Sequence, residues 1–381
     1  MKKIFFKVSF LIVPVIAFSL LQGCSKKVKT DQTTTDKVKT ADVLWSFKAE
    51  GPIVSSPVKF ENNIIFGSND KKLYSIDLNT HEKVWSFESD GRISNTPIIE
   101  ENTVIFSSNS TCYALDAKTG KEVWKYKSDK VGKDLSGGYD YHSPSPTLYK
   151  SLVIFQNRSG DMYGINKVDG KLQWQYKAEG CDDVITTPAI QDNILCIGDV
   201  SGNIFGIDLD TQKTIWKKSI GTKIVQAAFI YKDYVYFSGR DNIVAAYSLN
   251  DGGEKWSYAE PIGSWLTGDM IAKDDIVYVP GSDNHKIIAF NYNDGKVVGN
   301  LLGEANIFSK PTIKEDILYF TSGDVYKNKT GAVSGYDLST KKKVLLKMFE
   351  STIYSSPMVD EDVIYVGSSD GNLYALDGKV E

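Results

Sequence analysis

The residues best suited to nucleophilic or metal chemistry are few in this chain and stand far apart. They are four cysteines and three histidines: Cys24, Cys112, Cys181, Cys196, His81, His142 and His285. No two cysteines are adjacent and no CxxC pair occurs, so neither a zinc site nor a disulfide framework is indicated. Cys112 and Cys196 lie in strand-like stretches and are expected to be buried as small hydrophobic residues. Spacing alone leaves open whether Cys181 and Cys196 form a disulfide.

Motifs that position reacting groups are also missing from the sequence. We find no nucleophile elbow, P-loop or HExxH motif. The stretch NYNDG at residues 291–295 resembles part of a calcium-binding loop, but it directly follows a strand and is better explained as a hairpin turn. The sequence therefore predicts no catalytic residue, no metal site and no cofactor, and a function other than catalysis.

Cys24 is the one cysteine for which the sequence predicts a modification. A start with three lysines precedes an apolar run at residues 8–21, and LQGC at residues 21–24 resembles a bacterial lipobox. We expect residues 1–23 to be a lipoprotein signal peptide and Cys24 to carry the lipid anchor. An ordinary signal peptide with a chance cysteine is the alternative. Residues 24–42 contain no aromatic residue and are expected to form a flexible tether, which places the protein outside the cytoplasm on a membrane.

Charge and composition narrow the class of partner. The formal net charge is −4, and no basic stretch of the kind that binds nucleic acid stands out. The chain has 21 tyrosines and 17 phenylalanines, and long apolar helical patterns are few, which favours a β-rich fold. Nucleic acid is therefore not an expected partner.

A strand of the form LYALD, with a small third residue, recurs eight times. The copies end at Asp77, Asp116, Asn166, Asp208, Ser248, Asn291, Asp337 and Asp377. Their mean spacing is about 43 residues, which is the period of a four-stranded propeller blade. A second strand precedes each copy, and a third, often opened by Ser/Thr-Pro, comes before that. We predict an all-β fold, an eight-bladed β-propeller of four-stranded antiparallel blades over residues 43–381, in which the small residue lets a tryptophan of the adjacent blade pack closely.

An outer strand follows the first five copies and carries a tryptophan eight residues after the Asp-like position. These tryptophans, expected to dock structurally, are Trp85, Trp124, Trp174, Trp216 and Trp256. Gly299 and Leu345 take this place in the next two copies, and the eighth copy has no such strand. VLWSF at residues 43–47 contains Trp45 and is an outer strand with no repeat in front of it. We predict that it completes the last blade and closes the ring, which hides two sheet edges.

The segment YALDAKTGKEVW at residues 113–124 resembles the tryptophan-docking motif of the PQQ-like propeller repeat superfamily. The resemblance extends over residues 43–377 and weakens at Gly299 and Leu345, so blades six and seven are expected to be looser. It implies an eight-bladed propeller. The superfamily includes quinoprotein alcohol dehydrogenases and the BamB-type lipoproteins of outer-membrane protein assembly, and the motif is structural in both.

The remaining features resemble the BamB-type lipoproteins more than the enzymes. The dehydrogenases hold their quinone between a tryptophan and a disulfide of adjacent cysteines, which this chain lacks. The resemblance thus implies a lipid-anchored, non-enzymatic scaffold of the bacterial cell envelope. Its partner would be a protein, and a barrel-assembly protein if the organism has an outer membrane; otherwise the scaffold would lie at the cell surface. A propeller that binds a glycan or small ligand is the alternative, and a PQQ-dependent dehydrogenase is less favoured. The partner, the envelope type and the oligomeric state stay open.

Two sets of residues are candidates for a ligand or partner face. Loops at residues 127–146 and 322–333 exceed the repeat length, and the first contains Tyr139, Tyr141 and His142. The second set stands five residues before the strand-opening proline, or before the residue that takes its place, as Met270 does after Trp265, and there we expect one mouth of the channel. In chain order it is Pro52, Arg92, Tyr141, Asp183, Lys223, Trp265, Asn306 and Thr352. Aromatic and Arg side chains there would anchor a partner. The alternatives are an ordinary surface loop and a tryptophan that merely fills the channel.

Overall fold

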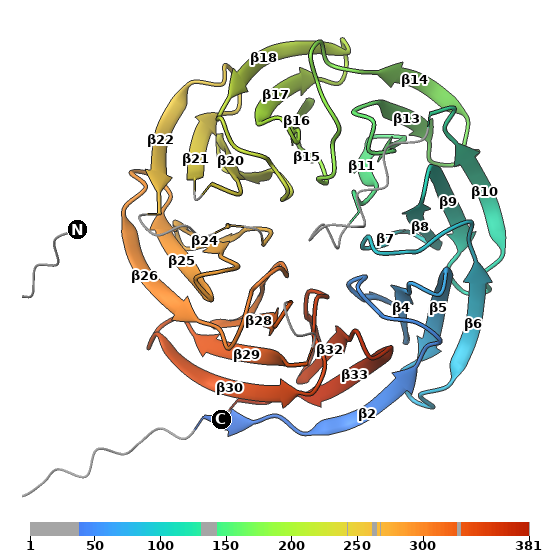
Figure 1. The fold of residues 1–381 in the computed structure, drawn as a ribbon. Coiled ribbons are helices and arrows are strands. Elements are labelled where there is room, and N and C mark those ends of the chain that lie inside the picture. The colour runs from blue at the N-terminus through green and yellow to red at the C-terminus, as the bar shows by residue number, and fades with distance from the viewer. Residues whose placement is uncertain are drawn as a thin grey trace, which may run out of the picture. The chain divides into compact units, whose positions relative to one another are not determined.

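The computed structural model describes residues 38–130, 143–241, 243–260, 265–266, 268–325 and 329–380. Residues 37–381 form one compact unit. Every regular element among the described residues is a strand, so none of them is a helix long enough to span a membrane. The strands form eight antiparallel blades arranged in a ring (Figure 1), which confirms the predicted eight-bladed propeller.

Each blade has four antiparallel strands, given below from the innermost strand, beside the channel, to the outermost strand, and for blades one to eight in order. The innermost strands are β3 (Val58–Phe60), β7 (Ile98–Glu100), β11 (Thr147–Tyr149), β15 (Ala189–Gln191), β19 (Phe229–Tyr231), β23 (Ile271–Lys273), β27 (Thr312–Lys314) and β31 (Met358–Asp360). The second strands are β4 (Asn63–Gly67), β8 (Thr103–Ser108), β12 (Leu152–Gln156), β16 (Ile194–Gly198), β20 (Tyr234–Ser238), β24 (Ile276–Pro280), β28 (Ile317–Gly323) and β32 (Val363–Gly367). The third strands are β5 (Lys72–Asp77), β9 (Thr111–Asp116), β13 (Met162–Asn166), β17 (Asn203–Asp208), β21 (Ile243–Ser248), β25 (Lys286–Asn291), β29 (Gly331–Asp337) and β33 (Asn372–Asp377). The outer strands are β6 (Lys83–Glu88), β10 (Glu122–Lys127), β14 (Leu172–Tyr176), β18 (Lys213–Ser219), β22 (Glu254–Ala259), β26 (Val297–Leu302), β30 (Lys342–Phe349) and β2 (Val43–Lys48).

The ring is closed by strands from opposite ends of the sequence. Strand β2 pairs antiparallel with β33, in a register that places Trp45 opposite Ala375. Figure 1 shows blue β2 beside red β33 at the junction. A second link lies nearer the channel, where the backbone N–H of Ser356 donates to Oγ of Ser56 at 2.9 Å. The predicted closure of the last blade by the N-terminal strand is therefore confirmed.

The packed part of the chain begins before the boundary at residue 43 that we predicted. A two-residue strand, β1 (Lys39–Thr40), pairs parallel with Leu345 and Leu346 of β30. Ala41 is fully buried, and the Lys39 ammonium lies 2.7 Å from a carboxylate oxygen of Asp377. The physical reason is that β30 is an outer strand with unpaired backbone groups, and the incoming chain pairs with some of them. Residues 39–42 thus belong to the propeller and not to the tether.

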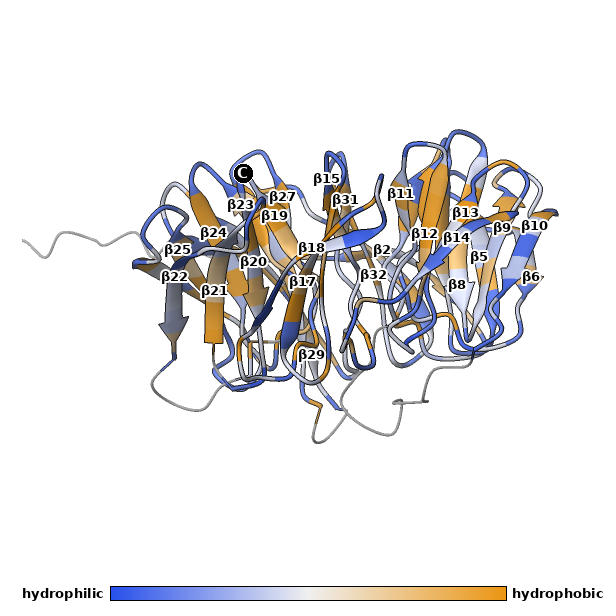
Figure 2. Ribbon diagram, turned by 90° about the horizontal axis from the view of Figure 1, so that it is seen from above, coloured by the Kyte–Doolittle hydropathy of each residue, from blue (hydrophilic) through white to orange (hydrophobic). Residues whose placement is uncertain are grey.

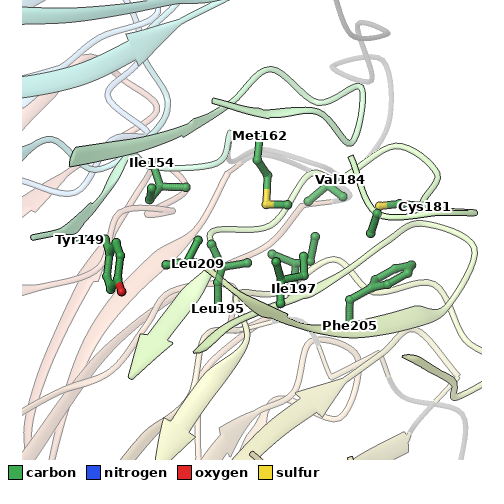
Figure 3. Packing of buried hydrophobic residues seen from close by; sticks show 11 residues of the cluster. Tyr149, Ile154, Met162, Cys181, Val184, Leu195, Ile197, Phe205 and Leu209 are labelled. Carbon is green, nitrogen blue, oxygen red and sulfur yellow. The ribbon is translucent and has the colours of Figure 1, made fainter. Parts of the chain in front are cut away.

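Hydrophobic cores lie between neighbouring blades. Side chains along a strand alternate between the two sheet faces, so successive residues of β4 contribute to different clusters. Ile64 and Phe66 pack toward blade eight, and Ile65 packs toward blade two. Figure 3 shows the corresponding cluster between blades three and four. Figure 2 shows that apolar residues concentrate along the strands and hydrophilic ones in the connecting loops.

The small third residue of each repeat serves its own blade and not the adjacent one, contrary to our prediction. Gly164 lies opposite Trp174 in the register of β13 and β14, and Gly206 lies opposite Trp216 in β17 and β18. A Cβ atom added to Gly206 would lie 2.1 Å from the Trp216 ring. The indole therefore folds down over the neighbouring strand of the same sheet.

Contact with the next blade is made by the far side of the tryptophan. Trp85 Nε1 donates to the backbone oxygen of Ala117 at 3.1 Å, and its ring lies against Gly120. Gly120 has a φ of +69°, and its turn is held by Asp116, whose Oδ1 accepts the backbone N–H groups of two following residues. The same bond to the next blade is made by Trp124, Trp216 and Trp256. The repeated motif is thus a clamp between blades.

Candidate functional site

The predicted channel-mouth positions are structurally equivalent in six blades. In each, the backbone oxygen of the predicted residue accepts an N–H from a residue at the end of the second strand of its own blade or just after it. The accepting residues are Pro52, Asp183, Lys223, Trp265, Asn306 and Thr352. In blade two, the backbone oxygen of Arg92 instead accepts the Ser108 hydroxyl at 3.4 Å. Tyr139, Tyr141 and His142 lie outside the described residues.

The side chains at these positions differ in what they can offer a ligand. Arg92 is exposed, and Asp183 and Lys223 are half-buried. Asn306 is only 2% exposed, and its amide donates to Ser282 Oγ at 3.2 Å, so its role is internal. Asn306 therefore does not present its side chain to a partner.

Trp265, the tryptophan outside the docking register, contacts a cation. The Arg240 guanidinium carbon lies 4.5 Å from the centroid of its ring. Trp265 is half-buried, and its backbone oxygen accepts the N–H of Ser282 at 2.7 Å. A guanidinium over an indole is a favourable cation–π pair, so the ring and the guanidinium form one unit of blades five and six.

The sequence analysis did not predict a ring of hydroxyl contacts between neighbouring blades. The side chain of the residue just before the proline that opens an inner strand accepts a backbone N–H from the preceding blade. Examples are Thr96 N–H to Ser145 Oγ and Ser145 N–H to Thr187 Oγ1, both at 3.0 Å. Asp269 plays this part for Ala227 N–H, at 2.9 Å. The Ser/Thr-Pro dipeptides are the sequence signal for these contacts, because their Ser or Thr supplies the hydroxyl. These side chains tie the blades together around the channel.

Blade five departs from this inner pattern. Gln226 is 2% exposed, and neither its amide oxygen nor its amide nitrogen has a hydrogen-bond partner among the described residues. The Ser238 hydroxyl, 1% exposed, is also without one. The equivalent side chains in four other blades bond within the blade: Asn95, Thr186, Ser309 and Ser355. A buried amide without a partner is costly, so this inner segment of blade five is suited to hold a small polar molecule. The buried Gln156 amide of blade three also lacks a partner among the described residues.

The cysteines of the described region are buried and not bonded to each other. Cys181 packs between blades three and four, whereas Cys196 packs between blades four and five. They therefore lie on opposite faces of one sheet, which answers the question that spacing left open. Burial raises the pKa of the Cys181 thiol to about 12 and also raises that of Cys112. Thiols with such pKa values are poor nucleophiles at neutral pH.

The histidines and acids do not gather into a metal centre either. Within the described ranges, no group of three or more His, Cys, Asp or Glu side chains is arranged to hold a metal ion. In the stretch at 291–295, Asn291 Oδ1 accepts the N–H of Asn293 at 2.9 Å, and Gly295 lies against the ring of Trp256. This stretch is the turn of blade six against which Trp256 of blade five packs.

Comparisons with known proteins identify relatives of two kinds. Outer membrane protein assembly factor BamB of Yersinia pestis is 23% identical over 230 residues, 57% of this chain and 56% of that protein. Tetrathionate hydrolase of Acidithiobacillus ferrooxidans is 29% identical over 33% of this chain and 28% of that protein. Quinoprotein alcohol dehydrogenase PedH of Pseudomonas putida is 27% identical over 42% of this chain and 26% of that protein. The chain thus spans from about a quarter to just over half of the length of these relatives.

A solved structure and a family model complete the comparison. The crystal structure of BamB from Moraxella catarrhalis has a TM-score of 0.63 at 17% identity and covers 88% of both chains, a likeness of fold. A family model described as outer membrane protein assembly factor BamB matches residues 34–258 and 183–380. The two matches together run through all eight blades. The chain therefore belongs to the family described as outer membrane protein assembly factor BamB.

Proposed function

We propose that the protein is a lipid-anchored, non-enzymatic scaffold that binds a protein partner in the bacterial cell envelope. The observation that carries this proposal is the family match over the whole propeller, in a family described by a role in outer membrane protein assembly. The local geometry supports it, since the repeated polar groups of the blades hold the ring together. Asx-capped turns, indole N–H groups and inner hydroxyls all bond to backbone atoms. Because these polar groups are used within the ring, a partner would be bound by the exposed loops and blade surfaces, as in a scaffold.

The partner is best sought in intact envelopes. Chemical crosslinking followed by affinity purification of the full chain should recover a protein of barrel assembly. If no protein is recovered reproducibly and the purified chain binds sugars tightly, the scaffold proposal fails and a lectin-like propeller takes its place. Gln226 and Ser238 are the residues that favour this second candidate, because their buried polar atoms lack partners. Gln226→Leu should weaken sugar binding only in that case.

The membrane anchor is the second part of the proposal. Cys24 would carry the lipid, and residues 24–38 would connect it to strand β1. At about 3.3 Å per residue, these 15 residues reach at most roughly 50 Å from the membrane. Cys24→Ser should leave the propeller folded and release it from membranes, because acyl chains supply most of the affinity. A variant that still sediments with membranes after a salt wash would contradict the lipoprotein assignment.

The enzyme alternative has a direct test, since two relatives carry the names of enzymes. The purified protein, supplied with PQQ and calcium, should not oxidise alcohols. The physical reason is the lack of adjacent cysteines that could form the disulfide platform for a quinone. Turnover that requires the quinone and disappears when calcium is removed would overturn the non-enzymatic proposal. The same preparation should leave tetrathionate unchanged, and its hydrolysis would have the same consequence.

A further inference from the structure

Several departures from the repeat fall together on blades five and six. The residue before the docking tryptophan is Lys255 in blade five. In the other seven blades it is Leu44, Val84, Val123, Gln173, Ile215, Val298 or Val344. Tyr234 and Tyr292 are likewise the single tyrosines at their repeat positions among the eight blades. The propeller fold does not require these three residues, since the other blades form without them.

These residues are in contact with one another. The Lys255 ammonium nitrogen lies 3.7 Å from the centroid of the Tyr234 ring and 4.8 Å from that of Tyr292. The Lys232 nitrogen lies 4.1 Å from the Tyr292 centroid and 5.4 Å from that of Tyr231. The Tyr231 and Tyr292 rings meet edge to face, with centroids 5.8 Å apart. We call these five residues the tyrosine–lysine patch.

The patch rests on a rigid support. The backbone oxygen of Tyr292 accepts the indole N–H of Trp256 at 2.9 Å and the buried Tyr236 hydroxyl at 3.4 Å. The three tyrosine rings of the patch are half-buried, so a part of each remains accessible. Tyrosine has two side-chain torsions and loses little entropy when it is covered, which suits it to a binding surface.

The charges of the patch are not balanced within it. Lys232 forms an ion pair with Asp275, which also accepts the Tyr231 hydroxyl at 3.2 Å. For Lys255, the described residues provide ring contacts but no carboxylate. Lysines between other blades do have one: Lys118 pairs with Glu61 and Lys273 with Asp316. Lys255 therefore holds a half-buried positive charge that no carboxylate of the described residues neutralises, and an anion is the ligand that such a charge favours.

We propose that the tyrosine–lysine patch is a docking surface for an acidic segment of a protein partner. A carboxylate of the segment would pair with Lys255, and its neighbouring side chains would cover the rings of Tyr234 and Tyr292. The chain as a whole has a formal charge of −4, so anions are not drawn to it in general, and the ring contacts are needed as well. This inference rests on the proposed scaffold function and names the surface that it uses.

The test places a photo-crosslinking residue, benzoylphenylalanine, at position 234 of the full chain in living cells. Thr103, the equivalent residue of blade two, is the matched control position. We expect a protein adduct from position 234 and none from position 103. Mass spectrometry should map the adduct to a partner segment that carries Asp or Glu within a few residues.

Charge variants then test the role of the ammonium. Lys255→Glu should reduce the adduct about tenfold or more, since charge-assisted bonds are worth at least that factor. Lys255→Arg should retain it, and Lys127→Glu on the outer strand of blade two should leave it unchanged. Circular dichroism melting of each variant verifies that the ring stays folded.

The outcomes separate this inference from the scaffold function. If envelope crosslinking recovers a partner but position 234 gives no adduct, the patch is wrong and the scaffold stands. An adduct with a glycan, a lipid or a segment without acidic residues contradicts the patch in the same way. If neither experiment finds a protein, the scaffold function fails first.

Discussion

The clamp between blades predicts that two glycines with the same backbone conformation respond differently to one added methyl group. Gly120 has a φ of +69° and Gly221 a φ of +71°. A Cβ atom at position 120 would lie 2.6 Å from the ring of Trp85, whereas one at position 221 would meet nothing within 4 Å. Gly221→Ala therefore measures the backbone cost alone, and Gly120→Ala measures that cost plus the damage to the clamp.

The expected magnitudes follow from these contacts. A non-glycine residue in the left-handed region costs roughly 1–2 kcal/mol, and the lower entropy of the unfolded alanine chain offsets about 0.4–1 kcal/mol of it. We expect Gly221→Ala to destabilise the propeller by about 1 kcal/mol. Displacing Trp85 adds roughly 1–3 kcal/mol of overpacking and about 1 kcal/mol for its bond to Ala117. Gly120→Ala should thus cost about 2–4 kcal/mol more than the control.

Urea unfolding followed by far-ultraviolet circular dichroism measures this difference without relying on indole fluorescence. With a slope of about 3 kcal/mol per molar urea, an excess of 2–4 kcal/mol lowers the midpoint by about 1 M. If both variants unfold at the same urea concentration, the contact between Trp85 and the turn of the next blade adds nothing to stability. The account of the repeat as a clamp between blades would then be wrong.

Three further predictions concern the turns, the ring closure and the inner ring of hydroxyls. Hydrogen bonds from the Thr119 hydroxyl and N–H lower the pKa of Asp116 in the folded protein. The Asp116 carboxylate therefore stabilises the fold at pH values above its unfolded pKa near 4, and this stabilisation is lost as the pH falls through the lower folded pKa. Asp116→Asn should keep the turn and make the urea midpoint less sensitive to acid. Deleting residues 43–49 should lower the melting temperature and cause association in size exclusion, since it exposes the edge of β33, whereas deleting residues 25–37 should do neither. Ala227→Ser should raise stability by about 0.5–1.5 kcal/mol in urea unfolding, because it supplies the hydroxyl that other blades offer to the preceding backbone N–H.

The parts of the fold that were predictable are those fixed by local sequence repeated many times. The position of Trp124 relative to Asp116 recurs with one spacing, and eight copies of a strand leave little choice of architecture. Closure of the ring by the strand that contains Trp45 was also predictable, because this outer strand has no repeat of its own and needs another sheet to pair with. The prediction that each small residue packs against a tryptophan of the adjacent blade was wrong. Residue spacing does not show which face of an indole contacts a given neighbour.

The sequence repeat could not predict features that depend on single contacts in one blade. Strand β1 has two residues inside a polar stretch, and only the open edge of β30 gives it a reason to form. The tyrosine–lysine patch joins residues up to 61 positions apart, from Tyr231 to Tyr292, which become neighbours only once blades five and six are placed. The mouth residue Asn306 was expected to face a partner, but its amide bonds to Ser282 inside the structure.

Closure of the ring by β2 and β33 has a consequence for how the chain reaches its native state. Their contacts join residues about 330 positions apart, such as Trp45 and Ala375, so this sheet has an extreme contact order. Seven blades have all four strands within reach along the chain and can form as they are synthesised. Blade eight cannot, because its outer strand is made first and its other three strands last. The two ends must meet after the rest has condensed, and we expect this meeting to be the slowest step of folding, during which β2 and β33 are unpaired strands exposed to other chains.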